Sequence, residues 1–165
     1  MNQDRVSAVD SDVDLHIPAQ RRELAGTPWP VLVAIAVGGA LGALARYGLT
    51  VLWPHASGAF PWATFVINVS GCLLIGCLMV LVDEAGVRHR LLRPFFGVGV
   101  LGGFTTFSSY VLDVQQLLSA GAAARALLYL AGTVLAALLA VWVGRSATGI
   151  ALSGLRRRIR ARRQL

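Results

Sequence analysis

Residues 97–110 read GVGVLGGFTTFSSY and lie inside a long apolar stretch, yet they suit a continuous helix poorly. The segment joins four glycines to a run of threonine and serine, and both kinds of residue weaken a helix interior. In lipid, irregular backbone is tolerated only where protein buries it or a watery cavity solvates its N–H and C=O groups. A break here predicts an ion site built from backbone carbonyls. The alternative is a close helix crossing, in which the glycines let two backbones approach.

The composition around this segment is that of an integral membrane protein. Of the 165 residues, 56% are hydrophobic and 14% are charged, whereas charged residues make up about 25% of a soluble domain. Four apolar runs are long enough to cross the roughly 30 Å of a hydrocarbon core, and they cover residues 31–52, 63–82, 94–118 and 122–143. Because the alternation of a β-barrel strand is absent, we predict an all-α membrane protein with four transmembrane helices, the third of them broken.

The four spans use most of the chain. We predict a disordered N-terminal tail at residues 1–28, a four-helix transmembrane domain at 29–145 and a basic C-terminal tail at 146–165. One such subunit has little interior with which to enclose a pathway, which favours an oligomer. The spans lack a Ser/His/Asp, Cys/His or paired-carboxylate arrangement, so we do not expect an enzyme.

All 15 basic residues are arginine, and their distribution is uneven. An even number of spans places both termini and the second loop on one side, and the loops on the opposite side hold only Arg125. The positive-inside rule therefore predicts that both termini are cytoplasmic. The C-terminal arginines directly follow a transmembrane helix, so we interpret them as an anchor for anionic lipid and not as a nucleic-acid site. These residues are Arg156, Arg157, Arg158, Arg160, Arg162 and Arg163.

Two polar residues stand within the first two spans. Arg46 is the only charge in its span, and it either serves a functional site or snorkels toward the polar loop at residues 53–61. Asn68 either hydrogen-bonds a neighbouring helix or faces an ion path as a donor. The sequence leaves both pairs of alternatives open.

The third and fourth spans carry residues that share a helix face. Phe107 and Tyr110 are three apart, and the positive edges of aromatic rings suit an anion, although such pairs also occur in ordinary packing. Tyr129 and Thr133 lie one turn apart and either form a polar stripe or bond a neighbouring helix. Asp113 lies farther along and is expected near the membrane interface, where it would be a poor proton relay.

Three segments, in this order, resemble the fluoride channel family known as Fluc or CrcB: GGALGALARY at 38–47, FVINVSG at 65–71 and GVLGGFTTFSSY at 99–110. The resemblance spans nearly the whole membrane portion. It implies an antiparallel, dual-topology dimer in the cell membrane, with two fluoride pathways along the subunit interface and a buried structural sodium ion (Na⁺) at its centre. The implied sodium ligands are the backbone carbonyls of Gly102 and Thr105 in each subunit, since carbonyl oxygens suit Na⁺.

The resemblance also implies a fluoride pathway. Phe107 and Tyr110 match the anion-facing aromatic pair, with Tyr where a second Phe is often found, and Asn68 matches the pore-lining amide. Ala137 is apolar where a polar track in the last helix would continue. The remaining implied pathway residues are Arg46, Ser108, Ser109, Tyr129 and Thr133.

The implied activity is passive export of cytoplasmic fluoride, which lowers its toxicity. The alternative is a small dimeric multidrug exporter coupled to protons, which needs a membrane-embedded carboxylate. The first, second and fourth core spans have none.

The arginine bias conflicts with an antiparallel homodimer, because one chain would then have to insert in both orientations. We therefore hypothesise a heterodimer with a homologous sister subunit of opposite charge bias. The alternative is a dual-topology homodimer whose assembly overrides the arginine tail.

Overall fold

The computed structural model describes residues 29–84 and 91–162, and these residues are helical apart from short connections. The elements are α2 (Trp29–Leu52), α3 (Trp62–Glu84), η1 (Arg93–Leu101), α4 (Gly102–Phe104), α5 (Ser108–Ser119) and α6 (Ala123–Arg162). Four stretches are long and apolar enough to cross a membrane, and the third, Arg93–Ser119, combines η1, α4 and α5. The prediction of an all-α protein with four spans and a broken third helix is confirmed.

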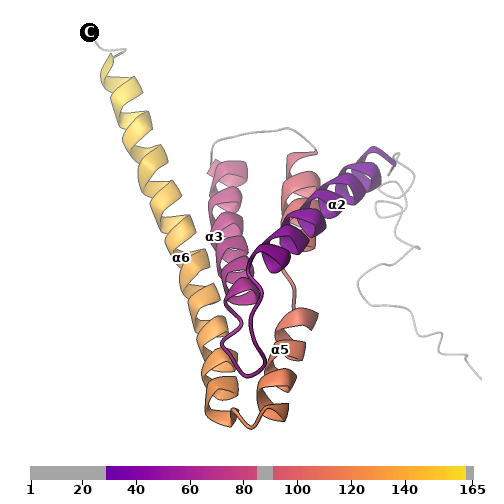
Figure 1. The fold of residues 1–165 in the computed structure, drawn as a ribbon. Helices are drawn as coiled ribbons and strands as arrows, with labels where there is room; N and C mark the ends of the chain where they lie inside the picture. Colours follow the sequence, from indigo (N-terminus) through magenta and orange to yellow (C-terminus); the bar gives the residue numbers. More distant parts are fainter. Residues whose placement is uncertain (1–28, 85–90, 163–165) are drawn as a thin grey trace, which may run out of the picture.

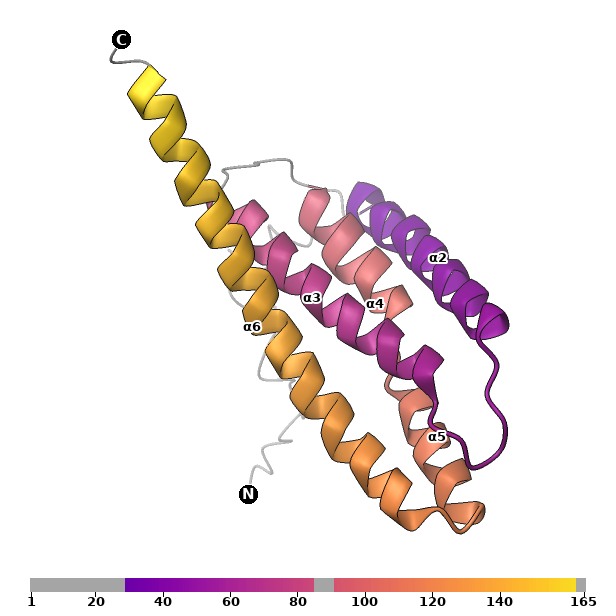
Figure 2. The same ribbon diagram turned by 60° about the vertical axis from the view of Figure 1, so that its left-hand side comes forward.

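The four spans run alternately in opposite directions. The start of α2 and the end of α6 lie at one end of the bundle, and the loop at 53–61 lies at the other end, beside the turn between α5 and α6 (Figures 1 and 2). α3 packs mainly along α6, whereas α2 packs along η1 and α4. The first half of the broken span thus packs on α2, whereas its second half, α5, packs on α6 beside α3.

Glycines bring α2 and the first half of the third span into backbone contact. Gly38 and Gly42 are buried on α2, in agreement with the close-contact face that their spacing predicts. A Cβ atom added at Gly99 would lie 3.0 Å from the Cα of Gly38, and one added at Gly42 would lie 2.8 Å from the backbone nitrogen of Phe104. Larger side chains at these positions would separate the two helices.

The break in the third span falls after its glycines, at residues 105–107. Gly102 has helical backbone angles (φ −65°, ψ −38°), and Thr105 is the first extended residue (φ −74°, ψ 159°). The break therefore falls in the threonine part of the predicted segment, and the glycines themselves stay helical, Gly97 and Gly99 within the π-helix η1. Their low helix propensity costs about 1 kcal/mol each, and in lipid a helix that packs closely still satisfies its backbone better than irregular chain does.

The fourth helix is longer than a membrane span. α6 has 40 residues, or about 60 Å at 1.5 Å per residue, roughly twice the thickness of a hydrocarbon core. The division at residues 145–146 between a transmembrane domain and a basic tail therefore falls inside one helix. That helix extends well beyond the rest of the bundle (Figure 2). The N-terminal tail at 1–28 lies outside the described residues.

An aromatic cluster joins α5 to the start of α6. Tyr110 and Tyr129 are buried in it with Leu117 and Ala126, and the Phe60 ring meets Tyr129 edge to face with centroids 5.3 Å apart. Such contacts are worth about 0.5–1.5 kcal/mol beyond burial. The cluster holds α5 against α6 directly after the break in the chain.

Candidate functional site

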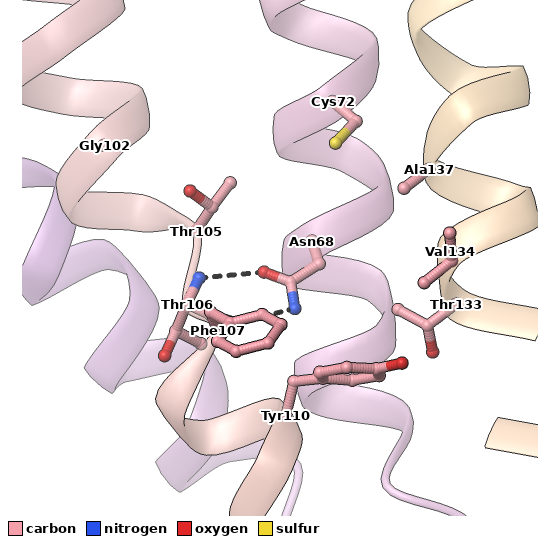
Figure 3. Close-up of a pocket in the computed structure, with 10 residues that line it drawn as sticks. All are labelled: Asn68, Cys72, Gly102, Thr105, Thr106, Phe107, Tyr110, Thr133, Val134 and Ala137. Carbon is pink, nitrogen blue, oxygen red and sulfur yellow. Dashed lines mark hydrogen bonds between the residues drawn. The ribbon is translucent and has the colours of Figure 1, made fainter. Parts of the chain in front are cut away.

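An open cavity of about 400 Å³ lies against the break in the third span (Figure 3). None of the residues that line it is charged. It collects much of the predicted site from three separate spans. Its lining residues are Asn68, Cys72, Gly102, Thr105, Thr106, Phe107, Tyr110, Thr133, Val134 and Ala137.

The Asn68 side chain holds the irregular backbone of the break. Its Nδ2 donates to the Thr106 carbonyl at 2.9 Å, and its Oδ1 accepts from the Thr106 backbone N–H, also at 2.9 Å. Figure 3 shows both bonds crossing from α3 to the break. The amide thus replaces the helical partners that Thr106 would otherwise have, and its second Nδ2 hydrogen is available to another acceptor.

This arrangement diverts the N–H donors of two backbone carbonyls. In a continuing α-helix, the Thr106 N–H would bond to Gly102 and the Ser109 N–H would bond to Thr105. Instead the Thr106 N–H is bound to Asn68, and the Ser109 N–H donates to the Thr106 Oγ1 at 3.2 Å. The carbonyls of Gly102 and Thr105, the predicted sodium ligands, therefore lose their helical donors. Oxygen atoms of this kind are suitable ligands for a hard cation.

The two aromatic side chains next to the break differ in exposure. Phe107 is 77% exposed and Tyr110 only 5%, although their ring centroids are 5.8 Å apart. The Tyr110 hydroxyl donates to the Leu130 carbonyl at 2.6 Å. Phe107 thus presents its ring to the open side of the cavity, whereas the hydroxyl that distinguishes Tyr110 is engaged with α6.

Thr133 supplies a hydroxyl without a partner. The residue is 4% exposed, and its Oγ1 is the one buried side-chain oxygen or nitrogen without a hydrogen-bond partner among the described residues. An unpaired hydroxyl is costly to bury, so such a group usually serves water or a ligand. Its place on the cavity wall fits the polar track predicted for the last helix.

A second cavity, of about 280 Å³, lies on the other side of the break and contains charged residues. Arg46 and Ser109 line it, and the Nε of Arg46 donates to the Gly103 carbonyl at 3.1 Å. Arg46 is therefore bonded to the third span.

Thr106 lines both cavities, and its Oγ1 lies 3.3 Å from the Oγ of the exposed Ser108. Sequence reasoning missed Thr106, although the paired threonines before Phe107 were a signal.

Asp113 and Tyr129 are bonded to each other inside the bundle. Tyr129 is fully buried and Asp113 is 8% exposed, and the tyrosine hydroxyl donates to Asp113 Oδ2 at 3.1 Å. Tyr129 thus bonds a neighbouring helix and does not line the open cavity. Asp113 lines the second cavity next to His55 of the loop at 53–61. It therefore lies toward that end of the bundle, but it is buried there. The aromatic cluster turns this face of α5 inward, which residue spacing did not reveal.

Carbonyls released at a helix break, beside a cavity lined by uncharged donors in a four-span bundle, define a small membrane protein suited to ion passage. A family model described as CrcB-like protein, Camphor Resistance (CrcB), matches residues 33–145. The chain belongs to this family.

Three relatives carry the same functional name. A Nocardia farcinica protein named fluoride-specific ion channel FluC 2 is 60% identical over 127 residues, which cover 77% of this chain and 91% of the relative. A Streptomyces avermitilis protein of the same name is 48% identical over 128 residues, covering 78% and 81%. The fluoride-specific ion channel FluC of Thermus thermophilus is 44% identical over 111 residues, covering 67% and 88%. These names favour the channel interpretation over a multidrug exporter.

Proposed function

We propose that this chain is a subunit of a fluoride-specific ion channel that lets cytoplasmic fluoride leave the cell passively. The observation that carries the proposal is the cavity beside the break. There the Asn68 amide, the unpartnered Thr133 hydroxyl and the exposed Phe107 ring meet without a charged residue. Fluoride holds its water tightly, so donors must replace that water. A full positive charge at the same place would hold the ion too strongly for rapid conduction.

The physical need for such a channel follows from acid–base chemistry. Neutral hydrogen fluoride crosses lipid in acidic surroundings, ionises in the cytoplasm and is then trapped as an anion. The negative membrane potential drives anions outward at about 2.3 kcal/mol per charge for each 100 mV. A passive pathway is therefore sufficient for export, and coupling to protons is not required.

Fluoride efflux from liposomes tests this function. Purified protein in liposomes loaded with potassium fluoride, with a potassium ionophore present and no pH gradient, should release fluoride but not chloride. Phe107→Ile keeps the bulk of the side chain and removes the aromatic quadrupole, so efflux should fall at least about tenfold, a change of 1.4 kcal/mol in the barrier.

Phe96→Ile is the matched control for the efflux test. Phe96 is also exposed, at 42%, but it lies on η1 and does not line the cavity. This variant should conduct like the wild type. Release that requires a pH gradient would favour the exporter, and equal efflux from both variants would remove Phe107 from the pathway.

Gly102 and Thr105 are proposed to hold a structural Na⁺ through their main-chain oxygens. The support is that both carbonyls lose their helical donors at the break, while both residues border the cavity. A bound ion at this place would be coordinated by the released carbonyl oxygens and would replace their lost hydrogen bonds in the assembled protein. Replacing sodium by N-methylglucamine should lower the melting temperature of the assembly, since a ligand at about 100 times its Kd stabilises by about 2.7 kcal/mol. Thr105→Ser should leave this sodium dependence intact, and a melting temperature indifferent to sodium would refute the site.

A second CrcB-type subunit is proposed to complete the cavity in the opposite orientation. Gly102 supports this, because its backbone is helical and a Cβ atom added there meets nothing within 4 Å in the described chain. Glycine is thus not required at residue 102 by the packing of the subunit itself. Gly102→Val should leave the monomer helical but abolish the dimer in cross-linking and light scattering. A stable Gly102→Val dimer with full efflux would place the partner elsewhere.

We further propose that the partner is a homologous sister subunit, and that both termini of this chain face the cytoplasm. The arginine distribution supports one orientation. Streptomyces avermitilis has relatives named FluC 2 and FluC 3, so one organism carries numbered copies. Attraction of the C-terminal arginines to anionic lipid would reinforce this orientation.

Labelling with a membrane-impermeant thiol reagent tests the orientation. Asn2→Cys precedes α2 in the sequence and Ser57→Cys follows it, so the two labels are expected on opposite sides of the membrane. The chain is labelled first when expressed alone and then with a sister subunit. Labelling of each site from one side only supports a fixed topology. Two-sided labelling of the lone chain, together with full efflux, would support the homodimer instead.

A further inference from the structure

His55 lies in the loop between α2 and α3, at the boundary of two cavities. It lines the second cavity together with Arg46 and Asp113. It also lines a third cavity of about 580 Å³, whose wall includes Ser57 and Gln115. The side chain is 28% exposed, so it is accessible to protons from water. A charge on this imidazole would face both spaces.

The imidazole of His55 is placed against a buried carboxylate. Its Nε2 lies 4.0 Å from Asp113 Oδ1, while Asp113 Oδ2 accepts the hydrogen bond from Tyr129. The loop that carries His55 is itself held, because the Nη1 of Arg125 donates to the Gly58 carbonyl at 2.8 Å. Gly58 has a φ of +78°, which favours glycine at this turn. The loop is thus held to the start of α6 three residues after His55.

Charged and titratable groups reach this place from three helices. α2 contributes Arg46, whose Nε is bonded to the backbone of Gly103. α5 contributes Asp113, and α6 contributes Tyr129, which binds that carboxylate. With His55 neutral, the charges of Arg46 and an ionised Asp113 cancel. With His55 protonated, the second cavity gains one positive charge.

Thr106 lines both the second cavity and the cavity beside the break. We propose that the second cavity opens at one mouth of the fluoride pathway and that His55 sets its charge, so that fluoride flux rises when the pH at this mouth falls. Histidine is the side chain whose charge ordinarily changes between about pH 5 and pH 8. A positive charge in a cavity with low-dielectric walls concentrates anions at the mouth. It also draws the Asp113 carboxylate into an ion pair, which reduces the repulsion of an approaching fluoride ion. The inference rests on the proposed channel function and assigns His55 an electrostatic role.

The direction of this effect matches the chemistry of fluoride stress. Acidic surroundings increase the fraction of neutral hydrogen fluoride and thus the entry of fluoride into the cell. A channel whose mouth gains positive charge in acid conducts best under that condition. Among the residues lining the second and third cavities, His55 is the one imidazole.

The test is fluoride conductance in planar bilayers with the same pH on both sides, varied in steps from about pH 8 to about pH 5.5. Wild-type conductance should rise by about threefold over this range, the order expected for one partly screened unit charge. His55→Gln should conduct without this rise, and His55→Arg should be high throughout. His89→Gln, the matched control, removes a histidine outside the described residues and should keep the wild-type profile. A wild type that is flat with pH, or a His55→Gln variant that keeps the rise, overturns the inference.

Asp113→Asn separates a working ion pair from a merely structural histidine. Without the carboxylate, the charge of Arg46 in the second cavity is no longer balanced, so conductance at about pH 8 should already exceed that of the wild type. Equal conductance of the two proteins at that pH would contradict the proposed effect of cavity charge. Conductance that selects fluoride but ignores pH removes only the role of His55. Absence of fluoride conductance at every pH removes the proposed function and the inference together.

Discussion

The two halves of the third span solve the same problem, fastening a helix inside a membrane, by different means. The half formed by η1 and α4 lies on α2 mainly through bare backbone, with Gly99 and Gly103 against its glycines, and one side-chain bond joins Arg46 to the Gly103 carbonyl. The other half, α5, is attached to α6 through side chains, namely the Tyr110 hydroxyl and the bond between Asp113 and Tyr129. The first half is thus held mainly by close backbone packing, and the second is held by hydrogen bonds from side chains.

Asn68 holds the break between these two halves through its two bonds to Thr106, and the contacts on either side of the break differ in what they tolerate. Glycine contacts are strict about volume but carry no charge or donor, so they can fix α2 and η1 without disturbing an ion path. Hydrogen bonds in the second half are strict about chemistry, because each lost partner leaves a polar group unpaired in a poorly solvated place. The comparison therefore predicts that size changes do most damage in η1 and α4, before the break. Polarity changes should act at the break and in α5, which follows it.

The largest effect is expected from a size change where α2 packs on the first half. A Cβ atom at Gly42 would meet the backbone of Val100 and Phe104, whereas one at Gly48 on the same helix meets nothing within 4 Å. Gly42→Val should cost more than the typical 1–3 kcal/mol of overpacking, since backbone cannot move aside as a side chain does. Gly48→Val should be nearly neutral. Detergent-solubilised yield, melting temperature and fluoride efflux measure the difference, and equal behaviour of the two variants would refute the role of this close packing.

A smaller effect is expected at the junction. Asn68→Ala leaves both the N–H and the C=O of Thr106 without their present partners, at about 1–3 kcal/mol for each unsatisfied group. Efflux should fall strongly while the protein still assembles. Asn68→Asp keeps an acceptor for the N–H but repels anions, so it should fold better than the alanine variant and conduct no better.

Ser70→Ala is the control on the same helix, because the Ser70 hydroxyl bonds only to carbonyls of its own helix, those of Val66 and Ile67, among the described contacts. That variant should retain both assembly and efflux. A loss of efflux equal to that of Asn68→Ala would show that any polar change on α3 is harmful, and would remove the special role of the junction.

The sequence predicted what depends on length, apolar pattern and local spacing. The four spans followed from their hydrophobic runs, and the contact face at Gly38 and Gly42 followed from small residues one turn apart. The break was expected in this segment from its glycines and its hydroxyl residues, and it falls among the latter. Its position is decided by Asn68, which is 38 residues from Thr106, and no local propensity contains that contact. The burial of Asp113 and its proximity to His55 likewise depend on how α5 meets α6 and the loop.

The smallest effect is expected at Tyr110, where the chain departs from a second phenylalanine. Its ring borders the open cavity, yet its hydroxyl is bound to the Leu130 carbonyl on α6. Tyr110→Phe removes that bond and keeps the ring, so it should lower stability by about 0.5–1.5 kcal/mol. Because the hydroxyl is directed at α6, fluoride efflux should change less than about twofold. The hydroxyl would then serve to hold α5 against α6, and the edge of the ring would remain free to contact the anion.

Tyr110→Ile sharpens this last comparison, because it removes the ring as well as the hydroxyl. If the ring edge contributes to the pathway, the isoleucine variant should lose efflux while the phenylalanine variant keeps it, with both melting below the wild type. A large gain of efflux in Tyr110→Phe would instead place the hydroxyl within the ion path. That result would mean that the bond to Leu130 opens during conduction. Tyr110 would then contact the ion directly and would not serve only to hold α5 against α6.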